Sequence, residues 1–314
     1  MQSFALRPWH LLCLLVCLTG MADVSAQPNL SQRSDPAVIS QGSAHYTFER
    51  LSAVSQDGLR RYRVVLALPK KAALAGGHSV IYLLDGNAAL DALDERLLAT
   101  LDAADPPVIV AIAHDTDLRF DPVARAYDYT PPVAGNDAPV DERGRAGGGA
   151  ASFLDLIVGT IKPAVARHAQ IDMRRQTLWG HSYGGLFVLY ALLHSPDAFQ
   201  LYVAASPSIW WQYGAILKDE ADGRSRILAL APQRRPQLTI LLGSEEGRRR
   251  AQASPPTGMR ASVAPDAAQQ FAHRMAADRL EVDFQIIEGL DHGPMLPASL
   301  LHALRLAADL PPHP

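Results

Sequence analysis

Six short apolar runs, separated by helical stretches, restrict the fold of this chain more than any other feature of its sequence. The runs lie at residues 80–86, 108–114, 176–180, 201–206, 238–243 and 282–289. Runs of this kind are typical of strands buried on both faces of a mainly parallel sheet. The predicted helices between and after them lie at residues 88–104, 151–169, 183–194, 211–230, 265–279 and about 297–308. This alternation predicts an α/β sheet with helices on both faces.

The chain before residue 80 has a different pattern. Apolar side chains alternate with polar ones in residues 46–51 and 62–68, and Asp57-Gly58 between them suits a hairpin turn. We therefore expect antiparallel strands at the start of the sheet. With 48% hydrophobic residues, 44–314 can form one domain, a three-layer α/β sandwich with a mostly parallel central sheet.

The first residues have the composition of a targeting segment. Residues 1–26 contain an apolar run at 11–18 and end in the small-residue sequence Val24-Ser25-Ala26, as in a cleavable signal peptide. The run is shorter than the roughly 20 residues that span a bilayer. We expect export to the periplasm without stable membrane insertion after cleavage, an uncleaved anchor being the alternative. Residues 27–43 are polar and predict a flexible segment.

Cysteine content and charge exclude several classes of protein. Cys13 and Cys17 are the two cysteines of the chain, and both lie in the predicted signal peptide. A cleaved chain would therefore have no disulfide, cysteine-bound metal or cysteine nucleophile. The net charge of -3, with both signs mixed along the chain, is unlike that of a nucleic-acid-binding protein.

A serine motif lies between a predicted strand and a predicted helix. Gly180, Ser182 and Gly184 form G-x-S-x-G after the strand at 176–180 and before the helix at 183–194. In this context the motif is a nucleophile elbow, a strained turn at which glycines avoid collisions. The pattern predicts the α/β-hydrolase fold with Ser182 as nucleophile.

A serine hydroxyl needs a neighbouring base to attack at neutral pH. In α/β-hydrolases the chain order is serine, acid and histidine, with the histidine after the last strand. His292 occupies that place and is the predicted base. His181 is next to the nucleophile, where the turn would point it away, so we expect a structural role. His114 and His273 are weaker alternatives.

The acid is expected after the strand at 238–243, where the chain has Glu245 and Glu246. Either carboxylate could orient the imidazole and stabilise its protonated form. We favour Glu246, with Glu245 or a Ser–His dyad without an acid as alternatives. Asp291 is adjacent to His292 in sequence and poorly placed to bond its ring.

Two backbone N–H groups should stabilise the oxyanion. One is that of Tyr183, directly after the nucleophile. The other should come from the turn after the strand at residue 80, with Asn87 as first choice and Gly86 as second. Asp85 in the same turn either caps the next helix or has a direct role.

Five segments resemble one group of esterases. They are, in chain order, `YLLDGNAAL`, `ARAYDYTPP`, `LWGHSYGGLFVLYALL`, `ASPSIWW` and `EGLDHGPM`. In this order they resemble the siderophore esterases that open the trilactone ring of enterobactin and of its glucosylated form salmochelin, particularly the periplasmic branch. The resemblance covers about residues 45–308 and includes the long polar loop at 115–150, a candidate wall of a binding site.

The resemblance implies a serine esterase that hydrolyses lactone bonds of a catecholate siderophore such as ferric enterobactin and so releases iron for uptake. It implies that Arg125 borders the substrate, and Trp210 and Trp211 either stack on catechol rings or pack in the core. Some members are described as using a Ser–His pair alone. No cofactor is implied, because iron arrives with the substrate, and we expect a monomer. The basic run 248–250 fits a solvated patch.

Two other functions fit the same residues. One is a general carboxylesterase or acyltransferase of this fold. The other is a siderophore-binding protein without catalysis, although such a protein has no need of Ser182, His292 or the elbow glycines.

Overall fold

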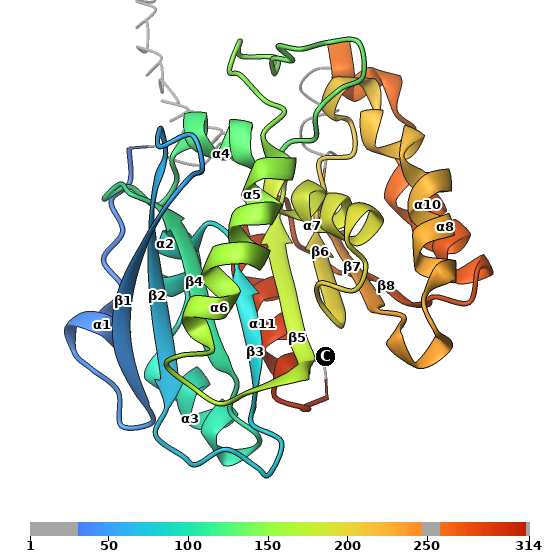
Figure 1. The fold of residues 1–314 in the computed structure, drawn as a ribbon. Coiled ribbons are helices and arrows are strands. Elements are labelled where there is room, and N and C mark those ends of the chain that lie inside the picture. Colours follow the sequence, from blue (N-terminus) through green and yellow to red (C-terminus); the bar gives the residue numbers. More distant parts are fainter. Residues whose placement is uncertain (1–30, 247–257, 312–314) are drawn as a thin grey trace, which may run out of the picture.

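A single mixed sheet organises the computed structural model, which describes residues 31–246 and 258–311. The predicted signal peptide and the run 248–250 lie outside the described residues. The strands are β1 (Tyr46–Val54), β2 (Arg61–Pro69), β3 (His78–Leu83), β4 (Val108–His114), β5 (Ile171–His181), β6 (Leu201–Ala205), β7 (Gln237–Gly243) and β8 (Glu281–Ile287). They lie in the order β1-β2-β4-β3-β5-β6-β7-β8 (Figure 1).

The direction of the strands agrees with the sequence pattern. β1 pairs antiparallel with β2, and β2 antiparallel with β4, whereas every other pair is parallel. All residues of β3 and β4 are buried, while β1 has buried and half-buried residues interspersed among exposed ones. The predicted α/β-hydrolase sheet, antiparallel at its start and parallel afterwards, is confirmed.

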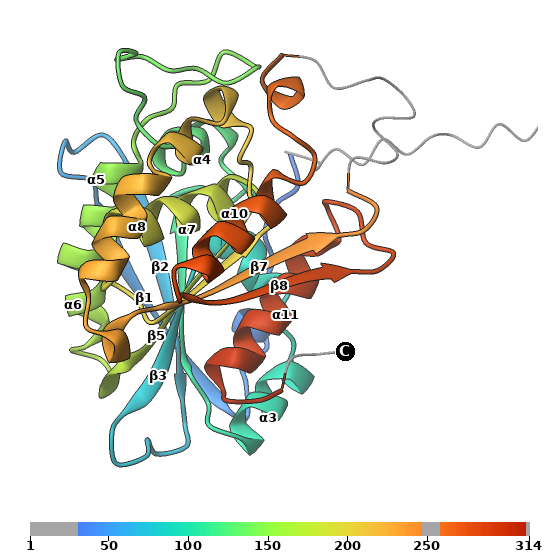
Figure 2. The ribbon, with the colours of Figure 1, turned by 90° about the vertical axis from the view of Figure 1, so that its right-hand side faces the viewer.

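Helices cover both faces of the sheet (Figure 2). The α-helices are α1 (Ala37–Ser40), α2 (Gly86–Leu90), α3 (Glu95–Ala103), α4 (Pro122–Asp128), α5 (Ala150–Leu156), α6 (Lys162–Val165), α7 (Tyr183–His194), α8 (Glu220–Ala229), α10 (Ala267–Ala277) and α11 (Met295–Ala307). One hydrophobic cluster joins α5, α7 and α10 to the sheet, and a second joins α2, α3 and α11 to its other face. These clusters form the two halves of a three-layer sandwich. Among the described residues, no helix is both long and apolar enough to span a membrane.

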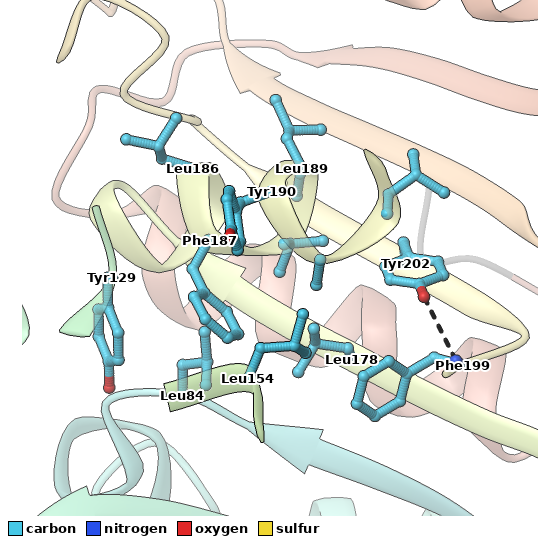
Figure 3. Close-up of a cluster of buried hydrophobic side chains, with 14 of the residues drawn as sticks. Leu84, Tyr129, Leu154, Leu178, Leu186, Phe187, Leu189, Tyr190, Phe199 and Tyr202 are labelled. Carbon is cyan, nitrogen blue, oxygen red and sulfur yellow. Dashed lines mark hydrogen bonds between the residues drawn. The ribbon is translucent and has the colours of Figure 1, made fainter. Parts of the chain in front are cut away.

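Helix α7 is buried on all sides. Its residues 183–193 are all buried, which explains why the segment is apolar around its whole circumference rather than along one stripe. Figure 3 shows Phe187 of this helix directed toward Leu84 and Tyr129, side chains from other elements of the core. The helix that follows Ser182 is therefore held from several directions.

Several predicted elements differ in detail. The helix expected at 88–104 is divided into α2 and α3, because Asp94 accepts a hydrogen bond from the N–H of Leu97 and caps a new helix there. The loop expected at 115–150 contains α4, which begins at Pro122 after the capping residue Asp121. Short capped helices of this kind have too few turns to show apolar periodicity.

The described part of the N-terminal segment contacts the domain. Val38 of α1 is buried. The N–H of Ser34 donates to the carbonyl of Asp117, and its hydroxyl donates to Asp91. Residues 31–43, expected to be flexible, are thus attached to the domain at several points.

Candidate active site

Ser182 lies between the end of β5 and the first residue of α7. Its φ of 62° and ψ of -114° are unusual for a residue with a Cβ, and such strain is typical of a nucleophile elbow. The N–H of Ser182 donates to the carbonyl of Ala205 on β6, and its carbonyl accepts from Leu186 on α7. These bonds fix the turn at the carboxyl end of the parallel strands.

The glycines around the elbow have unequal roles. A Cβ at Gly180 would lie 2.4 Å from the carbonyl oxygen of Gly184, and a Cβ at Gly185 would lie 2.6 Å from that of Ala205. A Cβ added at Gly184 would have its nearest neighbour at Leu84, at an ordinary distance of 3.6 Å. Because the backbone comes this close, only glycine fits without displacement at positions 180 and 185. Gly185 lies outside the serine motif.

The predicted base faces the predicted nucleophile. His292 lies in the loop between β8 and α11, and its Nε2 is 3.0 Å from Oγ of Ser182. Its Nδ1 is 3.2 Å from Oε2 of Glu246. The His292 side chain is 42% exposed, so the imidazole is open to solvent. Serine, imidazole and carboxylate are therefore within hydrogen-bonding distance in one chain of contacts.

Glu246 is held by groups other than the histidine. Its Oε1 accepts a hydrogen bond from the hydroxyl of Ser206 and another, of 2.9 Å, from the N–H of Gly243. Burial by itself raises the pKa of Glu246, but its bonds with His292, Ser206 and Gly243 outweigh burial and hold the pKa below its ordinary value. The ionised carboxylate is the favoured form. The adjacent Glu245 donates its backbone N–H to the carbonyl of Leu290.

Two serines of the `ASPSIWW` segment also touch this group, and sequence analysis assigned neither a role. Ser206 binds Glu246 and has a φ of 45°, which is uncommon for a non-glycine residue. Oγ of Ser208 lies 3.4 Å from Oγ of Ser182, and its N–H donates to the carbonyl of Ser182. The sequence signal that could have identified them is the repetition of serine in a segment that directly follows a parallel strand.

In the described chain, none of the other candidate histidines forms a hydrogen bond with the hydroxyl of Ser182. The ring of His181 is buried, and its centroid is 4.6 Å from that of His292. Burial, assisted by the charges of His292 and Arg125, lowers the pKa of His181 well below its usual value. Nε2 of His114 lies 2.9 Å from a carboxylate oxygen of Asp128. His273 is exposed on α10. His181 therefore packs against the ring of His292 as a neutral group.

The turn after β3 contains the two candidates for the second oxyanion donor, Gly86 and Asn87. Gly86 and Asn87 are the first residues of α2, as Tyr183 is of α7. Within the described chain, the backbone N–H groups of these three residues donate no hydrogen bond. Leu84, just before the turn, lies beside Gly184 near the start of α7. The available N–H groups thus belong to two neighbouring segments.

Asp85 and Arg125 form a buried ion pair. Nε and Nη2 of Arg125 lie 2.9 and 2.7 Å from the two carboxylate oxygens of Asp85. The Asp85 side chain makes no helix-capping bond, so the capping alternative is wrong. Arg125, which is expected to border the substrate, is thus held in place by a carboxylate of the protein.

The two tryptophans occupy different environments. Trp211 is completely buried, and a Cβ at Gly147 would come within 2.5 Å of its ring. Trp211 therefore packs in the core, which was one of the two predicted alternatives, and it is too buried to stack on a ligand. Trp210 is partly exposed, 5.8 Å from the ring of Tyr183, with the guanidinium of Arg260 at 3.6 Å over its own ring.

Metal ligands are not clustered in the part of the chain that the structure describes. There, no group of three or more His, Cys, Asp or Glu side chains could hold a metal ion. The groups gathered around Ser182 are suited to acyl transfer, in which a hydroxyl attacks a carbonyl carbon and an imidazole carries the proton.

A serine on a strained turn of this sheet, with an imidazole at 3.0 Å, defines a serine ester hydrolase of the α/β-hydrolase fold. The family model Esterase matches residues 55–290, and the chain belongs to this family.

Three proteins with similar sequences or structures are siderophore esterases or hydrolases by name. The chain is 42% identical to the apo-salmochelin esterase of Escherichia coli O6:H1 over 71% of its own length and 68% of the relative's. It is 33% identical to the ferri-bacillibactin esterase BesA of Bacillus subtilis, over 81% and 86% of the two chains. The solved structure of the enterobactin and salmochelin hydrolase IroE has a TM-score of 0.69 at 36% identity, covering 87% of this chain and 99% of that one. The resemblance inferred from the motifs is confirmed.

Proposed function

We propose that this protein hydrolyses the ester bonds of a catecholate siderophore trilactone, such as enterobactin or salmochelin, with Ser182 as its nucleophile. The observation that carries the proposal is the 3.0 Å contact between Oγ of Ser182 and Nε2 of His292. The substrate class is supported by the names of three similar proteins, each of which is an esterase or hydrolase of a siderophore.

The reaction proceeds through an acyl-enzyme. His292 removes the proton of Ser182 as the serine oxygen attacks a lactone carbonyl. The imidazolium then protonates the departing alkoxide oxygen, which becomes the free hydroxyl of the opened ring. A water molecule, deprotonated by the same imidazole, attacks the acyl carbon and releases the free acid. Glu246 keeps Nδ1 of His292 protonated and stabilises its positive charge, because the carboxylate is favoured in its ionised form.

The tetrahedral oxyanion lies between the turn after β3 and the start of α7. Tyr183 donates one backbone N–H to it, and Asn87 donates the second, with Gly86 as the alternative. The support is that these groups lie at two helix N-termini and donate no hydrogen bond within the described chain.

The aromatic wall of the substrate site contains Trp210. This ring is partly exposed and close to Tyr183, directly after the nucleophile. A catechol ring can stack on an indole face. Trp211 supports this wall from within the core. Arg125, whose guanidinium lies 5.6 Å from the ring of Tyr183, borders the substrate.

The proposed setting is the periplasm, reached through the signal peptide expected at residues 1–26. The enzyme acts as a monomer and needs no cofactor of its own, since iron arrives as part of the substrate. Hydrolysis of the trilactone would weaken the hold of the siderophore on iron and so release it for uptake.

The test is chromatography of the products formed by the purified protein from iron-free and iron-loaded enterobactin. We expect the cyclic trilactone to be converted to linear trimer or shorter fragments by the intact protein but not by Ser182→Ala. Ser208→Ala is a matched control, because it removes a neighbouring hydroxyl and leaves the nucleophile in place.

Parallel assays with a p-nitrophenyl ester separate the alternatives. Faster relative hydrolysis of the simple ester than of enterobactin would identify a general carboxylesterase and contradict the siderophore proposal. Binding of enterobactin with no cleavage of either compound would identify a binding protein and contradict the enzyme mechanism.

A further inference from the structure

We infer that the N-terminal strap, residues 32–35, positions helix α2 so that the backbone N–H of Asn87 is held ready for the oxyanion. The strap lies ahead of the catalytic domain in sequence, in the segment expected to be flexible. The inference rests on the proposed role of Asn87 as an oxyanion donor, and it names the groups that hold this donor in place.

The first observation is that helix α2 is too short to be stable by itself. It contains the five residues Gly86–Leu90, and the side chain of its N-cap residue, Asp85, makes no capping bond. An isolated helix of this length is not stable in water. The direction of the N–H of Asn87 therefore depends on contacts between α2 and other parts of the chain.

The second observation concerns the polar atoms of Asn87. Its Nδ2 donates to the carbonyls of Thr116 and Leu118, both at 2.8 Å. Its carbonyl lies 3.2 Å from Oγ of Ser34 in the strap. The backbone N–H of Asn87 donates no hydrogen bond within the described chain. The residue is thus held by its side chain and its carbonyl, and its N–H remains available for a ligand.

The third observation is that Asp91, directly after α2, binds the strap. Its Oδ1 lies 2.8 Å from Oγ of Ser34 and accepts the N–H of Asp35 at 3.0 Å. The single hydroxyl proton of Ser34 is therefore shared between Asp91 and the carbonyl of Asn87. Oδ2 of Asp91 lies 3.0 Å from Nε of Arg119, and the Asp91 side chain is 15% exposed. Limited access of water strengthens such bonds.

The fourth observation is that the strap also pairs with the loop that holds the side chain of Asn87. Arg33 forms an antiparallel bridge with Leu118. The N–H of Arg119 donates to the carbonyl of Gln32 at 2.9 Å. The strap and this loop therefore hold each other as well as Asn87.

An apolar contact follows the polar ones. Val38, three residues after the strap, is buried in the same hydrophobic cluster as Ala88, Ala89 and Leu90 of α2. The chain on both sides of the strap's last residues is therefore attached to α2, by hydrogen bonds before and by packing after.

This arrangement has a chemical consequence. A donor stabilises an oxyanion best when it already points at the position of the developing charge, because no reorganisation is then needed during the reaction. The strap supplies this preorganisation for Asn87. Loss of the strap's bonds should therefore slow the chemical step more than it weakens substrate binding.

The experiment compares Ser34→Ala, Asp91→Ala and their double variant in the full-length protein. We expect each single change to lower kcat by about 5- to 50-fold with KM changed much less, below the roughly 100- to 1000-fold loss that follows deletion of an oxyanion donor. The two losses should not multiply in the double variant, because one hydrogen bond joins the two side chains. Ser34→Thr retains the hydroxyl and should keep most of the parental kcat.

Asp105→Ala is the matched control for Asp91→Ala. Asp105 pairs with Arg175 at 2.6 Å, and the exposures of 15% and 26% are close to the 15% and 25% of Asp91 and Arg119. Asp105 lies just before β4, at the end of the sheet away from the elbow. We expect this variant to lose thermal stability and to keep the parental kcat. If Asp91→Ala does not fold, Asp91→Asn and Ser34→Ala carry the test.

Two further readouts separate positioning from a general loss of structure. A thionoester should lose less rate than its oxygen analogue in the strap variants, since sulfur accepts weakly from the same N–H groups. The rate at which a fluorophosphonate labels Ser182 should fall in parallel with kcat for a p-nitrophenyl ester. Neither measurement requires hydrolysis of a siderophore.

The inference is overturned if folded variants of Ser34 and Asp91 keep the parental kcat and the parental ratio of oxygen-ester to thionoester rates, whatever their melting temperatures. It is also overturned if the loss is confined to KM for the siderophore, which would make the strap a substrate contact. Failure of the proposed siderophore function has a different signature: the parent protein would not cleave enterobactin, while the simple ester and the fluorophosphonate would still report the effect of the strap.

Discussion

Nδ1 of His292 lies 3.2 Å from Oε2 of Glu246, while its Nε2 lies 3.0 Å from Oγ of Ser182. The imidazole is thus bonded at both nitrogens. The sequence alone is compatible with either a glutamate or no acid beside His292, and the structure brings one of the two adjacent glutamates to the ring. The predictions below depend on this arrangement.

Replacing the acid should slow the chemistry without preventing substrate binding. We expect Glu246→Gln to lower kcat by up to about 10,000-fold, the loss that follows when the acid of a serine triad becomes an amide, because the amide can favour the wrong tautomer of His292. Steady-state kinetics with a simple ester measure the effect. Glu245→Gln is the matched control and should retain parental kcat; an equal loss in the two variants would show that Glu246 has no special role.

Removing the hydroxyl that orients the acid should have a smaller effect. Ser206→Ala deletes a hydrogen bond to a charged group, and we expect kcat to fall by about 10- to 100-fold with KM nearly constant. Ser206→Gly deletes the same hydroxyl and also relieves the positive φ of 45°. The glycine variant should therefore melt at a higher temperature than the alanine variant but share its kcat. Parental kcat in both would mean that Ser206 does not act through Glu246.

The stability of the fold should depend on pH through Glu246. Its pKa is lower in the folded state than its ordinary value of 4.5, so the carboxylate stabilises the folded state fully above that value. The contribution is lost as pH falls through the folded pKa. Urea denaturation should therefore show a difference in unfolding free energy between the parent protein and Glu246→Gln that shrinks from neutral pH to about pH 3. A difference that grows on acidification would contradict the direction of the shift.

The elbow glycines should differ in their tolerance of alanine. Gly180→Ala and Gly185→Ala place a Cβ against backbone oxygens, and we expect each to cost about 1–3 kcal/mol or more of stability. Gly184→Ala meets only ordinary contacts and should keep a melting temperature close to the parental value, although it alters the serine motif itself. Thermal unfolding tests the ranking. Equal destabilisation at all three positions would contradict the difference in space around these glycines.

The fold was accessible from sequence because burial leaves a periodic signal. Strands such as β3 and β4 are buried on both faces, and their apolar runs are continuous. Helix α4 was not predicted. It is short, and it depends on the capping residue Asp121 and not on an apolar face. Local capping carries little weight in a pattern based on periodicity.

The candidate site was partly accessible for a similar reason. Ser182 and His292 follow strands of known order, so their meeting could be expected across 110 residues of sequence. Ser206 and the pairing of Arg125 with Asp85 could not be expected in this way. They depend on side-chain directions between loops that are distant in sequence, and a charged residue near a predicted site is compatible with either a ligand or a partner within the protein.

The most direct test of the central claim is to stop the reaction of the protein with enterobactin in acid after a few milliseconds and to analyse its peptides by mass spectrometry. The account predicts a transient acyl adduct on the peptide that contains Ser182, formed by the parent protein and missing from Ser182→Ala. An adduct on another residue, or cleavage of enterobactin by Ser182→Ala at the parental rate, would contradict it.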